Sequence, residues 1–262
     1  MMAKFNPTTM HQRQTGFTLI EISIVLFILA LVLGGLLPTL SSQVEQRHLT
    51  ETSSRLDEIK EALIGYAVIN GRLPCPATST SNGKESPSGG NCTYFSNTTN
   101  ANDDYLPAVT LGLSGTNSSG LLEDAWGNPI RYAVASSNST SPAFSNVFTT
   151  QGGMSSVGIS NLTDTNLSPD LLVCSAASGS NSSCTVGSTL SSYAVAVIYS
   201  TGKNGGSGGT SADEAENLNP NATDNHGNVF VSHDITNTFD DLVTWLSPNV
   251  LVNRMVSAGK LP

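Results

Sequence analysis

The longest apolar run of the chain lies near its N-terminus, from Phe17 to Leu37, and contains one charged residue, Glu21. A transmembrane helix needs roughly 20 predominantly apolar residues, so this run predicts a membrane-spanning helix over residues 17–40. The basic residues Lys4 and Arg13 precede the run. By the positive-inside rule, they predict a cytoplasmic N-terminus and an exported remainder.

Two simpler interpretations compete with a functional one for this apolar run. A secretory signal peptide would have a shorter apolar core with a cleavage site after it, whereas this core begins directly after Gly16 and ends at Pro38. A plain membrane anchor is the second alternative, and apolar content alone leaves it open. Glu21 favours a functional interpretation, because a carboxylate within a transmembrane helix costs a few kcal/mol and needs a positive partner.

A new N-terminus would supply that positive partner. Cleavage between Gly16 and Phe17 creates a cationic amine one helical turn from Glu21. In a packed bundle of helices, the amine of one subunit would neutralise Glu21 of a neighbouring subunit.

The helical pattern continues beyond the apolar run, through residues 39–70. Apolar side chains recur there at helical spacing on one face: Leu49, Leu56, Ile59, Leu63 and Tyr66. Gly71 and Pro74 then supply a stop. We expect one helix of about 50 residues. Its first half would lie in lipid or in a filament core, and its second half would present the apolar stripe to a globular domain.

Strand-like alternation appears in four short segments of the polar remainder: residues 129–136, 192–200, 228–233 and, more weakly, 170–175. Residues 75–120 are loop-like. We therefore expect a small antiparallel β-sheet packed on the long helix, which is an α+β fold.

The C-terminal segment carries two helix-start signals. Residues 238–241 have the pattern of a capping box and predict a short helix to Leu246. Ser247 followed by Pro248 predicts a second helix, with serine as the N-cap and proline in the first turn. Gly259 would close it.

The charge balance limits the partners. Charged residues make up 12% of the chain and the net charge is −9, which loss of Lys4 and Arg13 would change to −11. An acidic surface repels nucleic-acid phosphates, so we expect no nucleic-acid binding. The sequence also lacks a phosphate-binding loop, the signature of many nucleotide-using enzymes.

The four cysteines fall into two loop-rich stretches, which favours local disulfides Cys75–Cys92 and Cys174–Cys184. Three pairings are possible, and the sequence does not choose between them. Disulfides would imply an oxidising compartment such as the periplasm. Four free thiols remain the alternative, and a zinc site is disfavoured because no histidine lies near a cysteine pair.

The residues Gly16-Phe17-Thr18-Leu19-Ile20-Glu21 resemble the G-F-T-L-I-E signature of class III signal peptides, which belong to type IV pilins and to the pseudopilins of type II secretion. The resemblance implies cleavage after Gly16 by a prepilin peptidase and N-methylation of Phe17. It also implies that Glu21 contacts a neighbouring N-terminus during assembly. Pro38 sits where many such pilins have a helix-kinking proline.

This resemblance divides the chain into four parts. They are a leader peptide over residues 1–16, a transmembrane and filament-core helix over 17–40, its periplasmic continuation over 41–71, and a pilin-like globular domain over 72–262.

A second stretch, residues 124–132, resembles the D-x-W-G-x-P-x-x-Y segment of major pseudopilins. Its glycine, asparagine and proline predict a turn that leads into a strand, with Trp126 as a core anchor. That structural role is sufficient to explain the segment.

Residues 200–205 resemble the loop that binds calcium in major pseudopilins, which an acidic cluster follows. The resemblance implies calcium binding, and the preference of calcium for oxygen ligands suggests Asp213, Glu216 and the Asn204 amide as some of the ligands. The sequence departs from the family pattern at Lys203-Asn204, where an acidic residue would help. A solvated acidic loop is the alternative.

The sequence supports two hypotheses for the function. The first is a structural subunit, a pseudopilin or minor pilin, of a type II secretion pseudopilus or a type IV pilus. Its partners would be the prepilin peptidase, other pilin or pseudopilin subunits and an inner-membrane assembly platform. It would be a single-pass inner-membrane protein with a periplasmic C-terminal domain until it enters the filament. The alternative is a membrane-tethered adhesin or ligand-binding domain that uses the loops 76–103 and 203–225.

Overall fold

The computed structural model describes residues 16–92, 104–140, 142–162, 167, 171–178, 183–205, 211–218 and 228–261, and of residues 33–41 it describes the backbone only. The chain divides into two compact units, with the boundary after Arg47. The predicted leader, apart from Gly16, lies outside the described residues.

The long helix α1 runs from Leu19 to Asn70, as the sequence predicted. It belongs to the first unit up to Arg47 and to the second unit from His48 onward. It ends where predicted, because Gly71 takes a left-handed backbone conformation, with a φ of 71°, and donates a hydrogen bond to the carbonyl of Ala67. No helix among the described residues is both long enough and apolar enough to cross a membrane.

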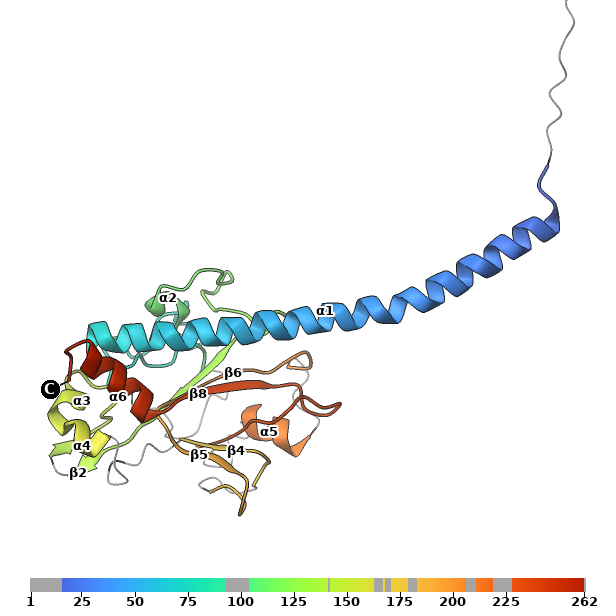
Figure 1. Cartoon of the computed structure of the whole chain (residues 1–262). Helices are drawn as coiled ribbons and strands as arrows, with labels where there is room; N and C mark the ends of the chain where they lie inside the picture. The colour runs from blue at the N-terminus through green and yellow to red at the C-terminus, as the bar shows by residue number, and fades with distance from the viewer. Residues whose placement is uncertain are drawn as a thin grey trace, which may run out of the picture. The chain divides into compact units, whose positions relative to one another are not determined.

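In the second unit, the part of α1 from His48 onward lies over an antiparallel sheet of order β1-β6-β8 (Figure 1). The strands are β1 (Arg131–Val134), β6 (Ala196–Ser200) and β8 (Leu242–Leu246). The central strand β6 is buried along its whole length, whereas β8 forms an edge and is only partly buried at four of its five positions.

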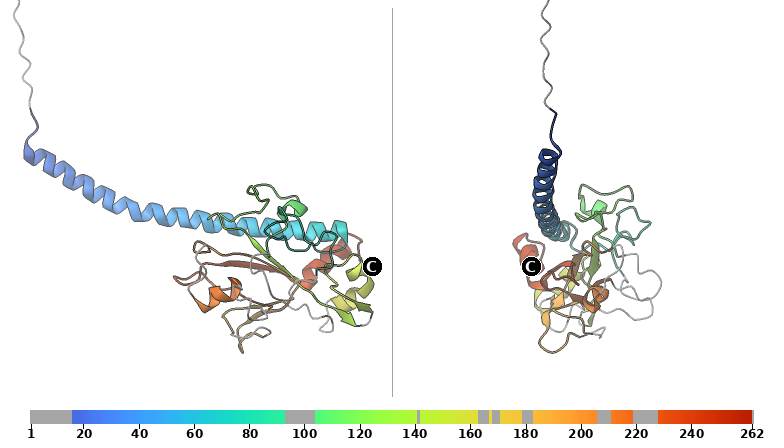
Figure 2. Two further views of the ribbon diagram at one scale, coloured as in Figure 1. Left: turned by 180° about the vertical axis from the view of Figure 1, so that it is seen from behind. Right: turned by 90° about the vertical axis from the view of Figure 1, so that its right-hand side faces the viewer.

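A second sheet lies on the side of the first that faces away from α1 (Figures 1 and 2). It has the order β5-β4-β7 and comprises β4 (Leu171–Cys174), β5 (Thr189–Ala194) and β7 (Val229–Val231). Strands β4 and β7 run parallel, so the expectation of a purely antiparallel sheet is wrong for this pair. The short strands β2 (Ser139–Thr140) and β3 (Ala143–Phe144) form a separate hairpin.

The predicted strand over residues 192–200 is two strands in different sheets. Strand β5 ends at Ala194 and β6 begins at Ala196, so the chain changes sheet at Val195. Residues 192–200 contain no glycine or proline, so the sequence shows no sign of a break at the point where the chain changes sheet.

The predicted helix ending at Leu246 is also wrong, because residues 242–246 form β8. Val243, Thr244 and Trp245 are β-branched or aromatic and fit a pleated surface. The strand pairs with β6 over five residues, from Leu242 opposite Ser200 to Leu246 opposite Ala196. This tertiary pairing outweighs the capping signal at residues 238–241.

The remaining helices are short: α2 (Ala108–Leu111), α3 (Gly153–Val157), α4 (Ile159–Leu162), α5 (Ala212–Leu218) and α6 (Pro248–Ser257). Helix α6 confirms the predicted C-terminal helix. The Ser247 side chain accepts a hydrogen bond from the Val250 amide at 3.4 Å, as an N-cap does.

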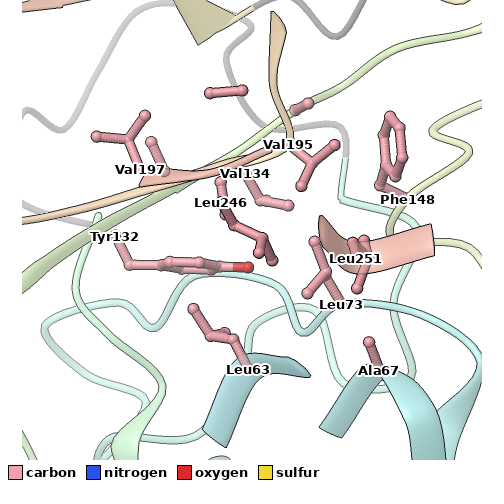
Figure 3. Close-up of a cluster of buried hydrophobic side chains, with 14 of the residues drawn as sticks. Leu63, Ala67, Leu73, Tyr132, Val134, Phe148, Val195, Val197, Leu246 and Leu251 are labelled. Carbon is pink, nitrogen blue, oxygen red and sulfur yellow. The ribbon is translucent and has the colours of Figure 1, made fainter. Parts of the chain in front are cut away.

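The core of the second unit lies between α1, α6 and the first sheet. Figure 3 shows Leu63 of α1 below the ring of Tyr132 of β1. Ala67 of α1 lies below Leu251 of α6, and Leu246 of β8 lies between the two pairs. All five side chains are fully buried. The Tyr132 hydroxyl donates a hydrogen bond to the Pro74 carbonyl at 3.1 Å, so the buried polar end of this side chain is satisfied.

The two disulfides pair as the sequence favoured, Cys75–Cys92 and Cys174–Cys184. Beside the first, Arg72 and Glu85 form a bidentate ion pair with N–O distances of 2.7 and 2.8 Å. The Glu85 carboxylate also accepts a hydrogen bond from the Cys75 amide at 3.1 Å. This network fastens the loop after α1 to the end of the helix.

Candidate functional site

The first turn of α1 contains a reciprocal capping arrangement between Thr18 and Glu21. The Thr18 amide and hydroxyl each donate to the Glu21 carboxylate at 2.8 Å, and the Glu21 amide donates to the Thr18 hydroxyl at 3.3 Å. This is a capping box, in which the side chains at the N-cap and third helical positions satisfy free backbone amides. Glu21 therefore has a structural role within its own chain that the sequence analysis missed.

The predicted cleavage position precedes this cap. Gly16 and Phe17 lie in exposed, non-helical backbone directly before the helix, and the Phe17 side chain is 84% exposed. A peptide bond in extended, uncovered chain is accessible to a protease, whereas one inside a helix is not.

The helix that follows is apolar on every side. Between Leu19 and Val32, large apolar side chains are exposed at almost every position: Leu19, Ile20, Ile22, Ile24, Val25, Leu26, Phe27, Ile28, Leu29, Leu31 and Val32. A helix that is apolar all round belongs in lipid or among other helices. This segment therefore needs covering by something other than the described part of its own chain.

In the second unit, the turn over residues 124–128 is organised by Asp124, which is 4% exposed. Its Oδ1 accepts hydrogen bonds from the Trp126 and Asn128 amides at 2.9 and 2.8 Å. Its Oδ2 accepts from the Ser200 hydroxyl at 2.6 Å. Trp126, the predicted core anchor, is only partly buried and contacts His48 edge to face, so Asp124 is the deeper anchor.

This turn holds the loop that follows β6. The Asn128 side-chain amide donates to the Gly202 carbonyl at 2.6 Å, and the Gly202 amide donates to the Ser200 hydroxyl at 3.1 Å. Gly202 has a φ of 61°, and a Cβ there would meet the Asp240 backbone. The two stretches that resemble major pseudopilins therefore lie against each other.

Beyond this loop, three carboxylates form a cluster. Oxygen atoms of Glu214, Asp240 and Asp241 all lie within 4.8 Å of one another. Asn204 borders the cluster: its side-chain amide donates to Glu214 at 3.0 Å and its backbone amide donates to Asp240 at 3.2 Å. The Asn217 amide donates to Asp241 at 2.8 Å.

Burial and mutual repulsion shape the protonation of this acidic cluster. Burial, followed by the nearby charge of Glu214, raises the pKa of Asp240. Burial is also the main cause that raises the pKa of Asp241 to about 7, with a smaller contribution from Glu214 and Asp240 and an opposing one from the Asn217 hydrogen bond. A divalent cation would remove the repulsion among the three groups.

The residues of the cluster fit a calcium ion. Calcium takes oxygen ligands, including carboxylates and amide carbonyls, and the Oδ1 atom of Asp240 is buried without a hydrogen-bond partner. Of the three ligands predicted from sequence, Asn204 hydrogen-bonds to two members of the cluster. Asp213 instead accepts from the Ala177 amide at 2.6 Å and contacts His233 at 3.3 Å, and Glu216 is not part of the group.

Comparison with known proteins gave one match. The model of the prokaryotic N-terminal methylation motif matches residues 11–37. No curated protein and no solved structure matched the chain. The match covers the apolar run, the Gly16–Phe17 position and Glu21, and so it agrees with the resemblance that these residues carry. The chain carries the prokaryotic N-terminal methylation motif, the hallmark of the prepilin-type signal of type IV pilins and pseudopilins.

Proposed function

We propose that this protein is a structural filament subunit, a pseudopilin or minor pilin of a type II secretion pseudopilus or a type IV pilus. One observation carries the proposal: the methylation motif opens a helix that is apolar and exposed on every side from residue 19 to residue 32. Such a surface is covered when the same helices of many copies pack together.

Processing and assembly would use two adjacent groups. A prepilin peptidase cleaves after Gly16, and the new amine of Phe17 is methylated. Within one chain, the Glu21 carboxylate caps its own helix through Thr18. In the filament, the Glu21 carboxylate of one copy accepts the charged amine of a neighbouring copy, because an unpaired carboxylate among apolar helices is costly.

The proposed location follows from the same motif. Before assembly the protein is held in the inner membrane by residues 17–40, with its N-terminus in the cytoplasm and the domain from residue 72 in the periplasm. An inner-membrane platform then extracts it into the filament. The two disulfides support an oxidising compartment for that domain.

The first experiment measures the intact mass and the N-terminal residue of the protein purified from membranes. We expect a chain that begins with methylated Phe17. In the same strain, Glu21→Ala should be cleaved normally but should be absent from sheared filaments, because the pairing that drives assembly is lost.

Glu58→Ala is the matched control for this experiment. Glu58 is an exposed carboxylate on the same helix, outside the apolar half, and its loss should leave filaments unchanged. An uncut chain, or one that is cut after the apolar run, would contradict the proposal and would leave an anchored or secreted domain.

We propose further that the acidic cluster of Glu214, Asp240 and Asp241 binds calcium and stabilises the loop after β6. The unpartnered Oδ1 atom of Asp240 and the close approach of three carboxylates support this role. The ligand set inferred from sequence, Asn204, Asp213 and Glu216, stays the competing prediction. The adhesin alternative stays a prediction as well, since much of its two loops lies outside the described residues.

A further inference from the structure

A groove runs between α1 and the edge strand β8 of the second unit. Its larger part has a volume of about 380 Å³ and is lined by Ser53, Leu56 and Asp57 of α1, by residues 232–235 and by residues 241–244. A neighbouring hollow of about 260 Å³ is lined by Lys60, Thr244, Trp245, Ser247 and Val250. The two share Thr244, so together they follow the flank of α1 from Ser53 to Lys60.

The groove is charged differently at its two ends. Asp57 and Asp234 line one end, and Lys60 lines the other. Within the described part of the chain, neither Asp57 nor Lys60 forms an ion pair. The ionisable side chain of His233 at the acidic end is already engaged with Asp213. The groove therefore suits a segment with a cation at one position and an anion one helical turn further on.

A segment of that kind lies upstream on the same helix. Val44, Arg47 and Glu51 are spaced at i, i+3 and i+7 and so share one face of α1. Val44 is 47% exposed, and Arg47 and Glu51 are exposed as well. Arg47 makes no ion pair among the described residues, and Glu51 pairs only with Arg55 of its own helix.

The two sets of residues match at one offset. Consider α1 of a second copy placed parallel to α1 of the first and displaced along it by nine residues. Val44 of the second copy is then level with Ser53 of the first, Arg47 is level with Leu56 beside Asp57, and Glu51 is level with Lys60. We propose that a second copy of this chain lies parallel in the groove at this offset, with Arg47 paired to Asp57 and Glu51 paired to Lys60. The offset corresponds to roughly 14 Å along a helix that rises 1.5 Å per residue.

This contact rests on the proposed filament function and specifies its partner. The face around Arg47 and the groove around Asp57 are different surfaces, so each copy offers one of each. A contact between unlike surfaces generates an open helical polymer unless its rotation closes a ring. The matched charges set the axial offset, because a slip by one helical turn would place Glu51 near Asp57 and would leave Lys60 unpaired.

Cysteine cross-linking in filaments of the full-length protein tests the offset. All four native cysteines are in disulfides, so introduced thiols react without competition. We expect Val44→Cys combined with Ser53→Cys to give a ladder of disulfide-linked multimers under mild oxidation. A bond within one chain is excluded, because nine residues of helix hold the two thiols too far apart.

The matched control replaces Ser53→Cys by Ser54→Cys. Both serines are exposed on α1, but Ser54 does not line the groove. This second pair should give at least tenfold less multimer. Equal ladders from both pairs, or no ladder from either in normal filaments, would overturn the proposed contact and leave the filament function standing.

Charge exchange provides a second readout. Glu51→Lys and Lys60→Glu should each reduce the filament yield several-fold, and the double variant should recover most of it. All strains are also scored for the mature Phe17 N-terminus, because unprocessed wild-type chains would show that the filament function itself has failed. If the double variant is processed normally but its filament yield does not recover, the pairing of Glu51 with Lys60 is contradicted and the filament function is not.

Discussion

Asp241 is 4% exposed, and its carboxyl group lies beside two other carboxyl groups. Its pKa of about 7 in the folded protein is far above its ordinary value of 3.8. The folded state therefore holds a proton that the unfolded state releases. The raised pKa therefore lowers the free energy of unfolding. This destabilisation is fully present above pH 7 and disappears as the pH falls toward 4.

In calcium-free buffer, we expect the protein to be more stable at pH 5 than at pH 8. The expected difference is roughly 2–3 kcal/mol, because only the part of the titration range that lies above pH 5 contributes to it. Urea unfolding of the full-length protein in detergent, followed by circular dichroism, measures it. Asp241→Asn should lose most of this difference, and an unchanged pH dependence in that variant would rule out Asp241 as its source.

Calcium should act on the same group of side chains. At pH 7.5, millimolar calcium should raise the unfolding midpoint, because the ion replaces the protons and offsets the repulsion. This rise in the unfolding midpoint should be abolished by Asp240→Asn and by Glu214→Gln. It should be kept in Asp213→Asn and in Glu216→Gln. The opposite pattern would favour the ligands inferred from sequence, and Asp234→Asn serves as an exposed control.

At the scale of elements, the buried ion pair of Arg72 and Glu85 joins the end of α1 to the disulfide loop after it. Their side chains are 6% and 10% exposed. Glu85→Gln leaves the guanidinium group of Arg72 uncompensated, and breaking such a buried pair costs roughly 3–5 kcal/mol. Chemical unfolding of the oxidised protein measures the loss.

Glu61→Gln is the control for that prediction. Glu61 also meets an arginine through both oxygens, Arg254 of α6, at 3.1 and 3.2 Å. Because both side chains are more than half exposed, the loss should stay below about 1 kcal/mol. If the two variants lost the same free energy of unfolding, burial would not determine the strength of these ion pairs.

Elements with a strong local signal were predictable from sequence. The apolar stripe and Gly71 predicted α1 and its end, and Ser247 with Pro248 predicted the start of α6. Strand β8 was not predictable, because its capping signal is local whereas its five pairs with β6 join residues more than 40 positions apart. Parallel pairing of β4 with β7 depends likewise on contacts between distant segments.

At the scale of the whole molecule, the same contrast separates the two candidate sites. Gly16, Phe17 and Glu21 are contiguous with the apolar run, so the sequence alone singles them out as candidate site residues. The acidic cluster joins Glu214 to Asp240, which is 26 positions away. Folding of α5 and β8 brings these residues together, and the sequence therefore directed attention to the nearer Asp213 and Glu216.

The two disulfides differ in their access to solvent. Cys75 and Cys92 are 0% and 1% exposed, whereas Cys184 remains partly exposed. Thiol–disulfide exchange requires direct attack on a sulfur atom. An oxidase can therefore reach the first pair only while the domain is still open, and it can reach the second pair in the finished fold. In the oxidising compartment proposed for this domain, we therefore expect the bridge beside α1 to close early, whereas the one at the end of β4 can be remade later.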